Sequence, residues 1–132
     1  MVDILVVSHS ENLAKAAIEF LSEMKYENFQ LDYCAGIIDG DQKAFGSDPM
    51  LIAAKIEKIY TKNDILIICD IGSSYMNSEM ALSFLINEIS PHVLIHHGPF
   101  FESLLIGIVS NDEKMTAQQL SEKISFDLKE TN

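Results

Sequence analysis

The sequence contains no arginine. All nine of its basic residues are lysine, and with 20 acidic residues the formal net charge is −11. A nucleic acid is a polyanion and therefore a poor partner for this surface, so no nucleic-acid binding is expected. Enzymes that hold free phosphate esters generally use the bidentate guanidinium of arginine. Any phosphate site in this chain must rely on backbone N–H groups, on lysine, or on groups that a partner supplies.

Long apolar runs and cysteine pairs are also missing. The longest apolar runs fall far short of the roughly 18 residues that span a membrane, so no membrane association is expected. The start, Met1-Val2-Asp3, carries an acid where a secretion signal is basic, and we expect a cytoplasmic protein. The two cysteines, Cys34 and Cys69, lie far apart without a C-x-x-C spacing. That predicts buried, reduced thiols rather than a redox or zinc motif.

Strand-like and helix-like segments alternate along the 132 residues. Short apolar runs predict strands at Ile4–Val7, Phe29–Ala35, Asp64–Cys69 and Val93–His96. Helical spacing predicts helices at Glu11–Met24, from Pro49, at Met76–Ile89 and at Thr116–Lys129; Gly36–Asp48 reads as a loop, and Phe100–Val109 fits a helix or a strand. We therefore expect one domain, residues 1–132, with an open, mainly parallel sheet in a three-layer α/β/α arrangement.

Two polar residues follow two of the predicted strands. His9 comes two residues after the first apolar run, and Asp70 comes directly after Asp64–Cys69. In parallel sheets, functional residues gather at the carboxyl ends of the strands, where the strand order reverses. In a 2-1-3-4 order the first and third strands are neighbours, so His9 and Asp70 would meet at one edge.

The chemistry of this pair points to phosphoryl transfer. A carboxylate at one imidazole nitrogen fixes the tautomer, steadies positive charge on the ring and leaves the other nitrogen free to attack phosphorus. Ser10 fits the start of the next helix, whose free N–H groups attract anions. Gly72, Ser73 and Ser74 add further candidate donors for a phosphoryl group. Alone, however, a histidine after a strand is more often structural, and the Asp70 segment also fits a turn.

Competing sites have weaker support. His96 and His97 are adjacent, and neighbouring residues of an extended chain point to opposite faces, so no metal site is expected. Neither G-x-G-x-x-G nor G-x-x-x-x-G-K-[ST] occurs, and no cofactor is predicted. Receiver domains need paired acids where this chain has Ser8 and His9, and histidine phosphatases need arginines. No role is assigned to His92, His96 or His97.

A set of short segments is shared with one known family. These segments are Val6-Val7-Ser8-His9-Ser10, Ala35-Gly36, Gly46, Asp70-Ile71-Gly72-Ser73, Met76-Asn77 and Glu79. Together they resemble the DhaM family, the phosphotransfer subunits of phosphoenolpyruvate-dependent dihydroxyacetone kinases, over nearly the whole chain. DhaM has the mannose-type enzyme IIA fold. The pattern D-[LIM]-G-S-x-x-M-N-x-E is the more specific part, because sugar-transport relatives have D-L-x-G-G-S-P there.

The resemblance implies a function and partners. His9 would accept a phosphoryl group from the carrier protein HPr and pass it to ADP held by the DhaL subunit, for phosphorylation of dihydroxyacetone (glycerone) bound to DhaK. Asp70 would be the carboxylate partner of a phosphohistidine, and the chain would form a homodimer. Some relatives fuse further carrier domains to this module. The resemblance covers the first module, so this chain is expected to depend on separate upstream proteins.

Other interpretations stay open at this point. One is a mannose-type enzyme IIA of a sugar-transporting phosphotransferase system, and another is a regulatory module that has lost phosphotransfer. The segment His97–Leu104 departs from the family, which usually has A-A-P-L-V-E-G-A there. The bulkier phenylalanines in this segment are expected to change the helix packing or the dimer contact and to leave the proposed chemistry untouched.

Overall fold

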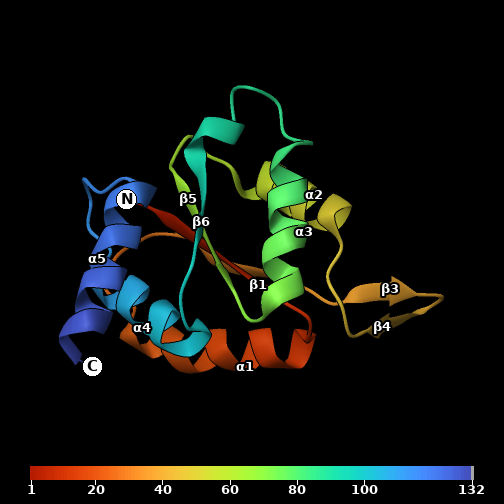
Figure 1. Cartoon of the computed structure of the whole chain (residues 1–132), viewed down its shortest axis with the longest axis horizontal. Helices are drawn as coiled ribbons and strands as arrows, with labels where there is room; N and C mark the ends of the chain where they lie inside the picture. Colours follow the sequence, from red (N-terminus) through yellow and green to blue (C-terminus); the bar gives the residue numbers. More distant parts are fainter. Residues whose placement is uncertain (132) are drawn as a thin grey trace.

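The computed structural model describes residues 1–131, in which a central sheet is covered by helices on both faces (Figure 1). The strands are β1 (Asp3–Ser8), β2 (Leu31–Ala35), β3 (Ile37–Asp39), β4 (Gln42–Ala44), β5 (Ile65–Cys69) and β6 (Val93–His96). The helices are α1 (Glu11–Leu21), α2 (Pro49–Ile59), α3 (Gly72–Leu82), α4 (Phe100–Ser110) and α5 (Ala117–Thr131), with short 3₁₀ turns η1 (Ser22–Met24) and η2 (Ser90–His92).

The main sheet has four parallel strands in the order β2-β1-β5-β6. This is the predicted 2-1-3-4 order, because β5 is the third long strand of the chain. The second strand, β2, therefore lies on one side of β1, and the later strands β5 and β6 lie on the other. The strand order reverses between β1 and β5, which places a crevice at their carboxyl ends.

The core consists of two apolar layers, one on each face of the sheet. Alternate side chains of β1 point to opposite faces, so Ile4 and Val6 pack in one layer and Leu5 and Val7 in the other. Helices α1, α4 and α5 cover the first layer, and α2 and α3 cover the second (Figure 1). The central strands β1 and β5 are buried throughout, as continuous apolar runs predict.

The starts of α1 and α2 follow from local capping chemistry. The Ser10 hydroxyl accepts a hydrogen bond from the Leu13 N–H at 3.2 Å, and the Asp48 carboxylate accepts one from the Met50 N–H at 2.8 Å. Pro49 takes the first helical position of α2. These predicted helix starts are confirmed, and the ambiguous segment after Pro99 is the helix α4.

The prediction of a loop at Gly36–Asp48 was wrong. This segment contains the antiparallel hairpin β3–β4, which projects from the body of the molecule (Figure 1). Its strands are three residues long and mostly exposed, so they lack the alternating apolar pattern that identifies a strand in sequence. The two-residue turn between Asp39 and Gln42 uses Gly40 at a positive φ of 62°.

The predicted bounds of two helices were also wrong. The apolar spacing predicted a helix at Met76–Ile89, but α3 begins at Gly72 and ends at Leu82. The buried side chains of α3 are small, namely Ser74, Ser78 and Ala81, so its core face is invisible to a search for large apolar residues. The first helix ends at Leu21 rather than Met24, and Leu13 and Phe20 are exposed.

No helix among the described residues 1–131 is long and apolar enough to cross a membrane. Both cysteines are free thiols: Cys69 is buried and Cys34 is half-buried. Burial raises the pKa of the Cys69 thiol to about 12, so this thiol stays protonated at neutral pH.

Candidate functional site

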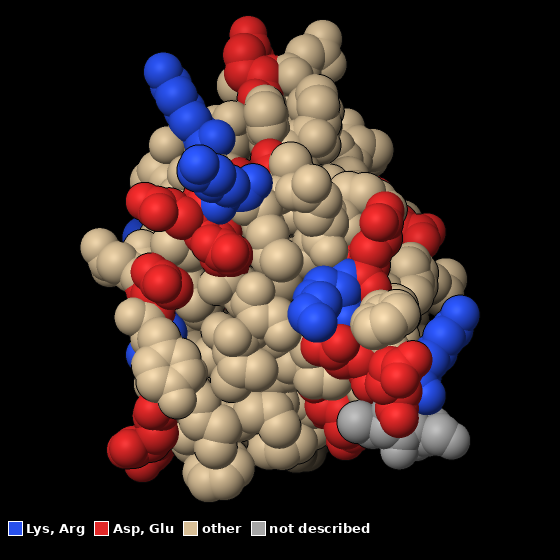
Figure 2. Space-filling model, turned by 90° about the vertical axis from the view of Figure 1, so that its left-hand side faces the viewer, with Lys and Arg blue, Asp and Glu red and all other residues tan. Residues whose placement is uncertain are grey.

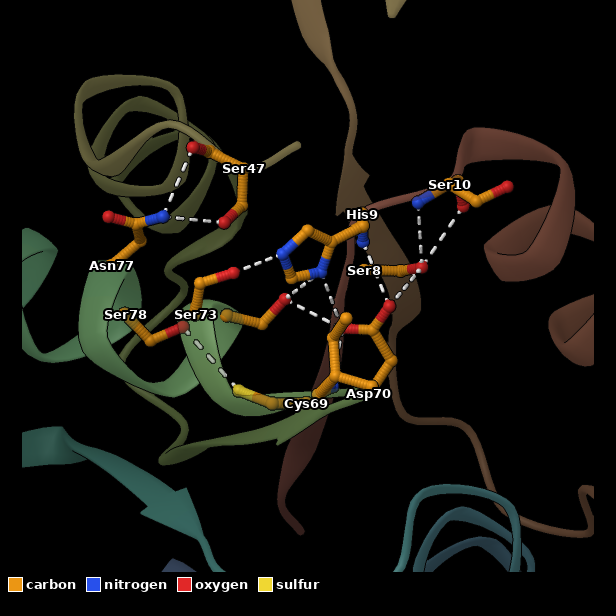
Figure 3. A network of polar contacts seen from close by, with 11 residues as sticks. Ser8, His9, Ser10, Ser47, Cys69, Asp70, Ser73, Asn77 and Ser78 are labelled. Atoms are coloured by element: carbon orange, nitrogen blue, oxygen red, sulfur yellow. Dashed lines mark hydrogen bonds and ion pairs between the residues drawn. The ribbon is translucent and has the colours of Figure 1, made fainter. Parts of the chain in front are cut away.

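The carboxyl ends of β1 and β5 bring His9 and Asp70 together. Val7 pairs with Cys69 in the sheet, and the Asp70 N–H donates to the Val7 carbonyl at 3.1 Å. His9, two residues after Val7, and Asp70, directly after Cys69, therefore lie side by side (Figure 3). The predicted meeting of His9 and Asp70 is confirmed as geometry: Nδ1 of His9 lies 3.2 Å from Oδ1 of Asp70.

Several donors converge on the Asp70 carboxylate. Its Oδ2 accepts from the His9 backbone N–H at 2.9 Å and from the Ser8 hydroxyl at 3.0 Å. Its Oδ1 accepts from the Ser74 hydroxyl at 2.6 Å and from the Ile71 N–H at 2.7 Å. The side chain is 7% exposed, so these bonds largely replace water around the charge.

The pKa of Asp70 reflects this environment. Burial alone raises the pKa of the carboxyl group, because it disfavours the charged form. Hydrogen bonds from the Ser74 hydroxyl, from two backbone N–H groups and from the His9 ring outweigh burial, so the pKa lies below its usual value of 3.8. Asp70 is therefore an ionised acceptor at neutral pH, able to hold a proton on Nδ1 of His9 by hydrogen bonding.

The two nitrogens of His9 have different surroundings. Nδ1 faces inward, toward Asp70 and toward the Ser74 hydroxyl at 3.0 Å. Nε2 faces outward and contacts the Ser73 hydroxyl (Figure 3). A proton on Nδ1 satisfies the inner acceptors and leaves the lone pair on Nε2, to which Ser73 can donate. The ring is 20% exposed, which leaves its outer nitrogen within reach of a partner.

Ser74 belongs to the inner part of the site. The sequence predicted Ser74 as a phosphoryl contact, together with Ser10, Gly72 and Ser73. In the structure Ser74 is fully buried, and its hydroxyl is engaged by Asp70 and His9. The hydroxyl that contacts Nε2 is that of Ser73, in the first turn of α3, which begins at Gly72 and has no side-chain cap.

Ser10 lies on the opposite side of His9 from α3 (Figure 3). Its side chain caps α1, and its backbone N–H donates to the Ser8 hydroxyl at 3.0 Å. Ser8 is a residue of this candidate site that the sequence prediction did not select. It is fully buried and joins the Ser10 backbone to Oδ2 of Asp70, so it ties the ends of both strands together. Its position at the end of a buried strand, directly before His9, is the sequence feature that could have identified it.

The hairpin segment closes another side of the site. The Gly46 N–H donates to the His9 carbonyl at 2.9 Å, so residues after β4 hold the backbone of the histidine. The Asn77 side chain of α3 donates to the Ser47 hydroxyl at 2.7 Å and to its carbonyl at 3.1 Å (Figure 3). These bonds link α3, the hairpin and His9, and none of them is detectable from sequence spacing.

The other histidines lie away from this site. His96 is buried with Nδ1 2.8 Å from the Ser121 hydroxyl, and His97 stacks on Tyr75 with ring centroids 5.1 Å apart. His92 pairs with Asp64 at 3.0 Å, at the amino ends of the strands. Within the described part of the chain, no group of three or more His, Cys, Asp or Glu side chains is placed to hold a metal ion.

With this geometry established, comparison with known proteins assigns a family. The family model described as "PTS system fructose IIA component" (EIIA-man) matches residues 3–125. The chain belongs to the EIIA-man family. Its fold agrees with that of the EIIA phosphotransferase-system component from Streptococcus agalactiae, at a TM-score of 0.71 and 16% identity over 100% of this chain and 95% of that one. A second crystal structure, that of "unknown function protein EF1359", matches at a TM-score of 0.80 and 27% identity, covering 93% of this chain and 92% of that one.

Curated relatives within the family carry one name. The "PEP-dependent dihydroxyacetone kinase, phosphoryl donor subunit DhaM" of Escherichia coli K12 is 30% identical over 83% of this chain, and that of Klebsiella michiganensis is 32% identical over 83%. This chain spans only 23% of the length of each of those proteins. The DhaM of the second such kinase in Listeria innocua is 29% identical over 84% of this chain and 86% of its own length.

Proposed function

We propose that this EIIA-man chain is the phosphohistidine carrier of a phosphoenolpyruvate-dependent dihydroxyacetone kinase. In this proposal His9 accepts a phosphoryl group from HPr and passes it to ADP held by DhaL, for phosphorylation of dihydroxyacetone on DhaK. The observation that carries the proposal is that the two imidazole nitrogens of His9 have different surroundings: Asp70 faces Nδ1, and Nε2 faces outward. The names of the relatives support the kinase system as the setting.

The chemical step balances on the two nitrogens of His9. The Nε2 lone pair attacks the phosphorus of the donor phosphohistidine, an N–P bond forms on His9, and the donor's N–P bond breaks with its electron pair returning to the donor ring. The proton on Nδ1 stays in place, so the His9 ring gains positive charge. The ionised Asp70 at 3.2 Å stabilises that charge, and its four other hydrogen bonds hold it in position. Transfer onward to ADP reverses the step at His9.

The transferred phosphoryl group needs its own stabilisation. We assign this to the Ser73 hydroxyl and to the N–H groups of Gly72 and Ser73 at the start of α3, with Ser10 on the α1 side. Ser74 acts differently: its buried hydroxyl bonds to both Asp70 and Nδ1 of His9 and holds the two groups in position. Because the chain has no arginine, further positive charge must come from the donor protein or from the acceptor's nucleotide site. We treat residues 1–132 as one carrier domain that acts in the cytoplasm as a homodimer.

The experiment that tests this proposal is a reconstitution followed by intact mass. The chain is incubated with phosphoenolpyruvate, enzyme I and HPr, and then with ADP-loaded DhaL, DhaK and dihydroxyacetone. We expect one acid-labile phosphoryl increment that disappears in the second stage as dihydroxyacetone phosphate forms. The increment should be absent from His9→Ala and present in His92→Ala, which disrupts a similar histidine–aspartate pair at the other end of the sheet. Uptake without discharge to DhaL would point to a sugar-transport enzyme IIA, and no uptake would point to a module without phosphotransfer.

A further inference from the structure

Large apolar side chains are exposed around the candidate site. Phe45, Met50, Ile71, Met76 and Met80 are each more than half exposed to solvent. We call these five residues the methionine collar. Isolated exposed apolar residues are normal, but a set on the segments that hold one functional group indicates an interaction surface.

The collar residues belong to the segments that hold His9. Phe45 precedes Gly46, whose N–H donates to the His9 carbonyl at 2.9 Å. Met76 precedes Asn77, whose amide donates to the Ser47 hydroxyl at 2.7 Å and so fixes α3 against the segment that leads to Met50. The collar is therefore attached to the site by hydrogen bonds on the hairpin side and on the α3 side.

Helix α3 turns its two methionines outward. Its buried side chains are small, which lets the helix lie close to the sheet, while Met76 and Met80 are exposed. Residues three and four apart share a helix face, so Met76 and Met80 continue the face that Ser73 begins. Since the Ser73 hydroxyl contacts Nε2 of His9, this apolar face runs outward from the nitrogen to which we assign phosphoryl transfer.

We propose that the methionine collar is the docking surface for the phosphoryl-donor protein. This inference rests on the proposed function, because it assumes that Nε2 receives its phosphoryl group from another protein. A protein that brings phosphorus to Nε2 must cover Ser73 and its neighbours on α3. Methionine suits such a surface, because its flexible side chain fits partners of different shape, and the same nitrogen must later meet an acceptor.

The charge around the collar defines the chemistry of the partner. Besides the largely buried Asp70, the segments 36–50 and 70–80 carry four acidic residues and a single lysine, Lys43. A donor with an apolar patch and a rim of lysine or arginine complements this surface and brings the cations that a phosphoryl group requires. A second copy of this chain would place acids against acids at the same position. The donor protein, rather than self-association, is therefore the occupant of the collar.

The test compares the donor dependence of matched variants. Met76→Gln/Met80→Gln keeps side-chain length and removes the apolar surface, and Met76→Leu/Met80→Leu keeps the apolar surface. Phe126→Gln is the control: Phe126 is 59% exposed on α5, across the sheet from α3, where acids and lysines are interspersed on the surface (Figure 2). The initial rate of His9 phosphorylation is measured against the concentration of phosphorylated HPr.

We expect the apparent KM for HPr to rise about tenfold or more in the glutamine double variant, with kcat little changed. The leucine double variant and Phe126→Gln should keep the wild-type KM. Equal KM values in the glutamine variant and the wild type would overturn the proposal. So would a loss of dimer in sedimentation of the glutamine variant at unchanged KM, because the collar would then serve a second copy.

A small phosphoryl donor separates this inference from the proposed function. The fraction of protein that phosphoramidate labels at His9 reports the reactivity of the histidine without protein docking. Each rate of His9 phosphorylation by phosphorylated HPr is divided by that fraction. Labelling of the wild type with a raised KM in the glutamine variant supports the collar. If phosphoramidate and phosphorylated HPr both fail to label His9 in the wild type, the proposed function itself fails, and the collar loses its basis with it.

Discussion

The hydroxyl of Ser74 lies 2.6 Å from Oδ1 of Asp70 and 3.0 Å from Nδ1 of His9, so one buried oxygen contacts both members of the candidate pair. Ser74 donates its only proton to the carboxylate and can then accept from Nδ1–H. Ser74 lies four positions after Asp70, and the first turn of α3 brings them together. The helix start thus fixes the orientation of the imidazole through the Ser74 side chain.

Replacing Asp70 with asparagine should slow phosphoryl uptake while keeping the shape of the site. The amide carries no charge to stabilise the His9 ring, and a charged hydrogen bond contributes about 1.5–3 kcal/mol. We expect a loss of about 10- to 100-fold in the rate of transfer from phosphorylated HPr, measured in single turnover. Asp64→Asn is the matched control, since Asp64 pairs with His92 at the amino ends of the strands. Equal rates for Asp70→Asn and the wild type would remove the carboxylate from the mechanism.

Replacing Ser74 with alanine should act through Asp70. Because the Ser74 hydroxyl is the foremost of the bonds that lower the pKa of Asp70, that pKa should rise in the variant, and uptake should fall by several fold. Ser78→Ala is the control, because Ser78 is equally buried on α3 but contacts Cys69 instead of the site. The carboxyl titration is followed by NMR of Asp70. An unchanged Asp70 pKa in Ser74→Ala, or an equal shift in Ser78→Ala, would contradict this role.

Protonation of His96 should make the protein less stable in mild acid. Burial and the neighbouring His97 lower the pKa of His96 below its usual 6.5. The unfolded chain therefore binds a proton below pH 6.5 that the folded chain does not, and stability declines from there down to the lowered pKa. The decline is at most about 1.4 kcal/mol per pH unit. The free energy of unfolding in urea is measured for the wild type and His96→Gln between pH 7.5 and 5. It should fall more steeply with decreasing pH in the wild type, and equal slopes for the two proteins would exclude His96 as the cause.

A methyl group at Gly98 should destabilise the fold. A Cβ at this position would lie 2.8 Å from Nε2 of His96 and 2.8 Å from the Ser103 hydroxyl, both in buried side chains. We expect Gly98→Ala to lower the free energy of unfolding by about 1–3 kcal/mol, as overpacking does. Gly72→Ala is the comparison, since a Cβ there meets nothing within 4 Å. Denaturant unfolding of both variants measures the difference, and equal stabilities would refute the predicted clash.

The sequence predicted the parts of the fold that depend on large apolar residues and on capping. The buried runs of β1 and β5 identified the central strands, and their carboxyl ends located His9 and Asp70. Ser10 and Asp48 identified two helix starts. In each case one local interaction dictates the residue type, so the pattern is readable without the rest of the structure.

The rest depends on contacts between distant segments. The core face of α3 consists of Ser74, Ser78 and Ala81, so apolar periodicity moved the predicted helix downstream. The hairpin is held by bonds such as Gly46 N–H to the His9 carbonyl, which leave no mark in local sequence. For the same reason Ser8 and Asn77 were not selected: their side chains act on residues more than 25 positions away. Backbone bonds and small buried side chains therefore shape much of this site.

The most direct test of the central claim is ¹⁵N and ³¹P NMR of the protein after phosphorylation by HPr, with the imidazoles ¹⁵N-labelled. The account predicts a ³¹P–¹⁵N coupling at Nε2 of His9, a proton retained on Nδ1, and no phosphorylation of His92, His96 or His97. Phosphorus on Nδ1 of His9, or on any other histidine, would contradict it, because the Asp70 carboxylate would then face the reacting nitrogen or take no part in the transfer.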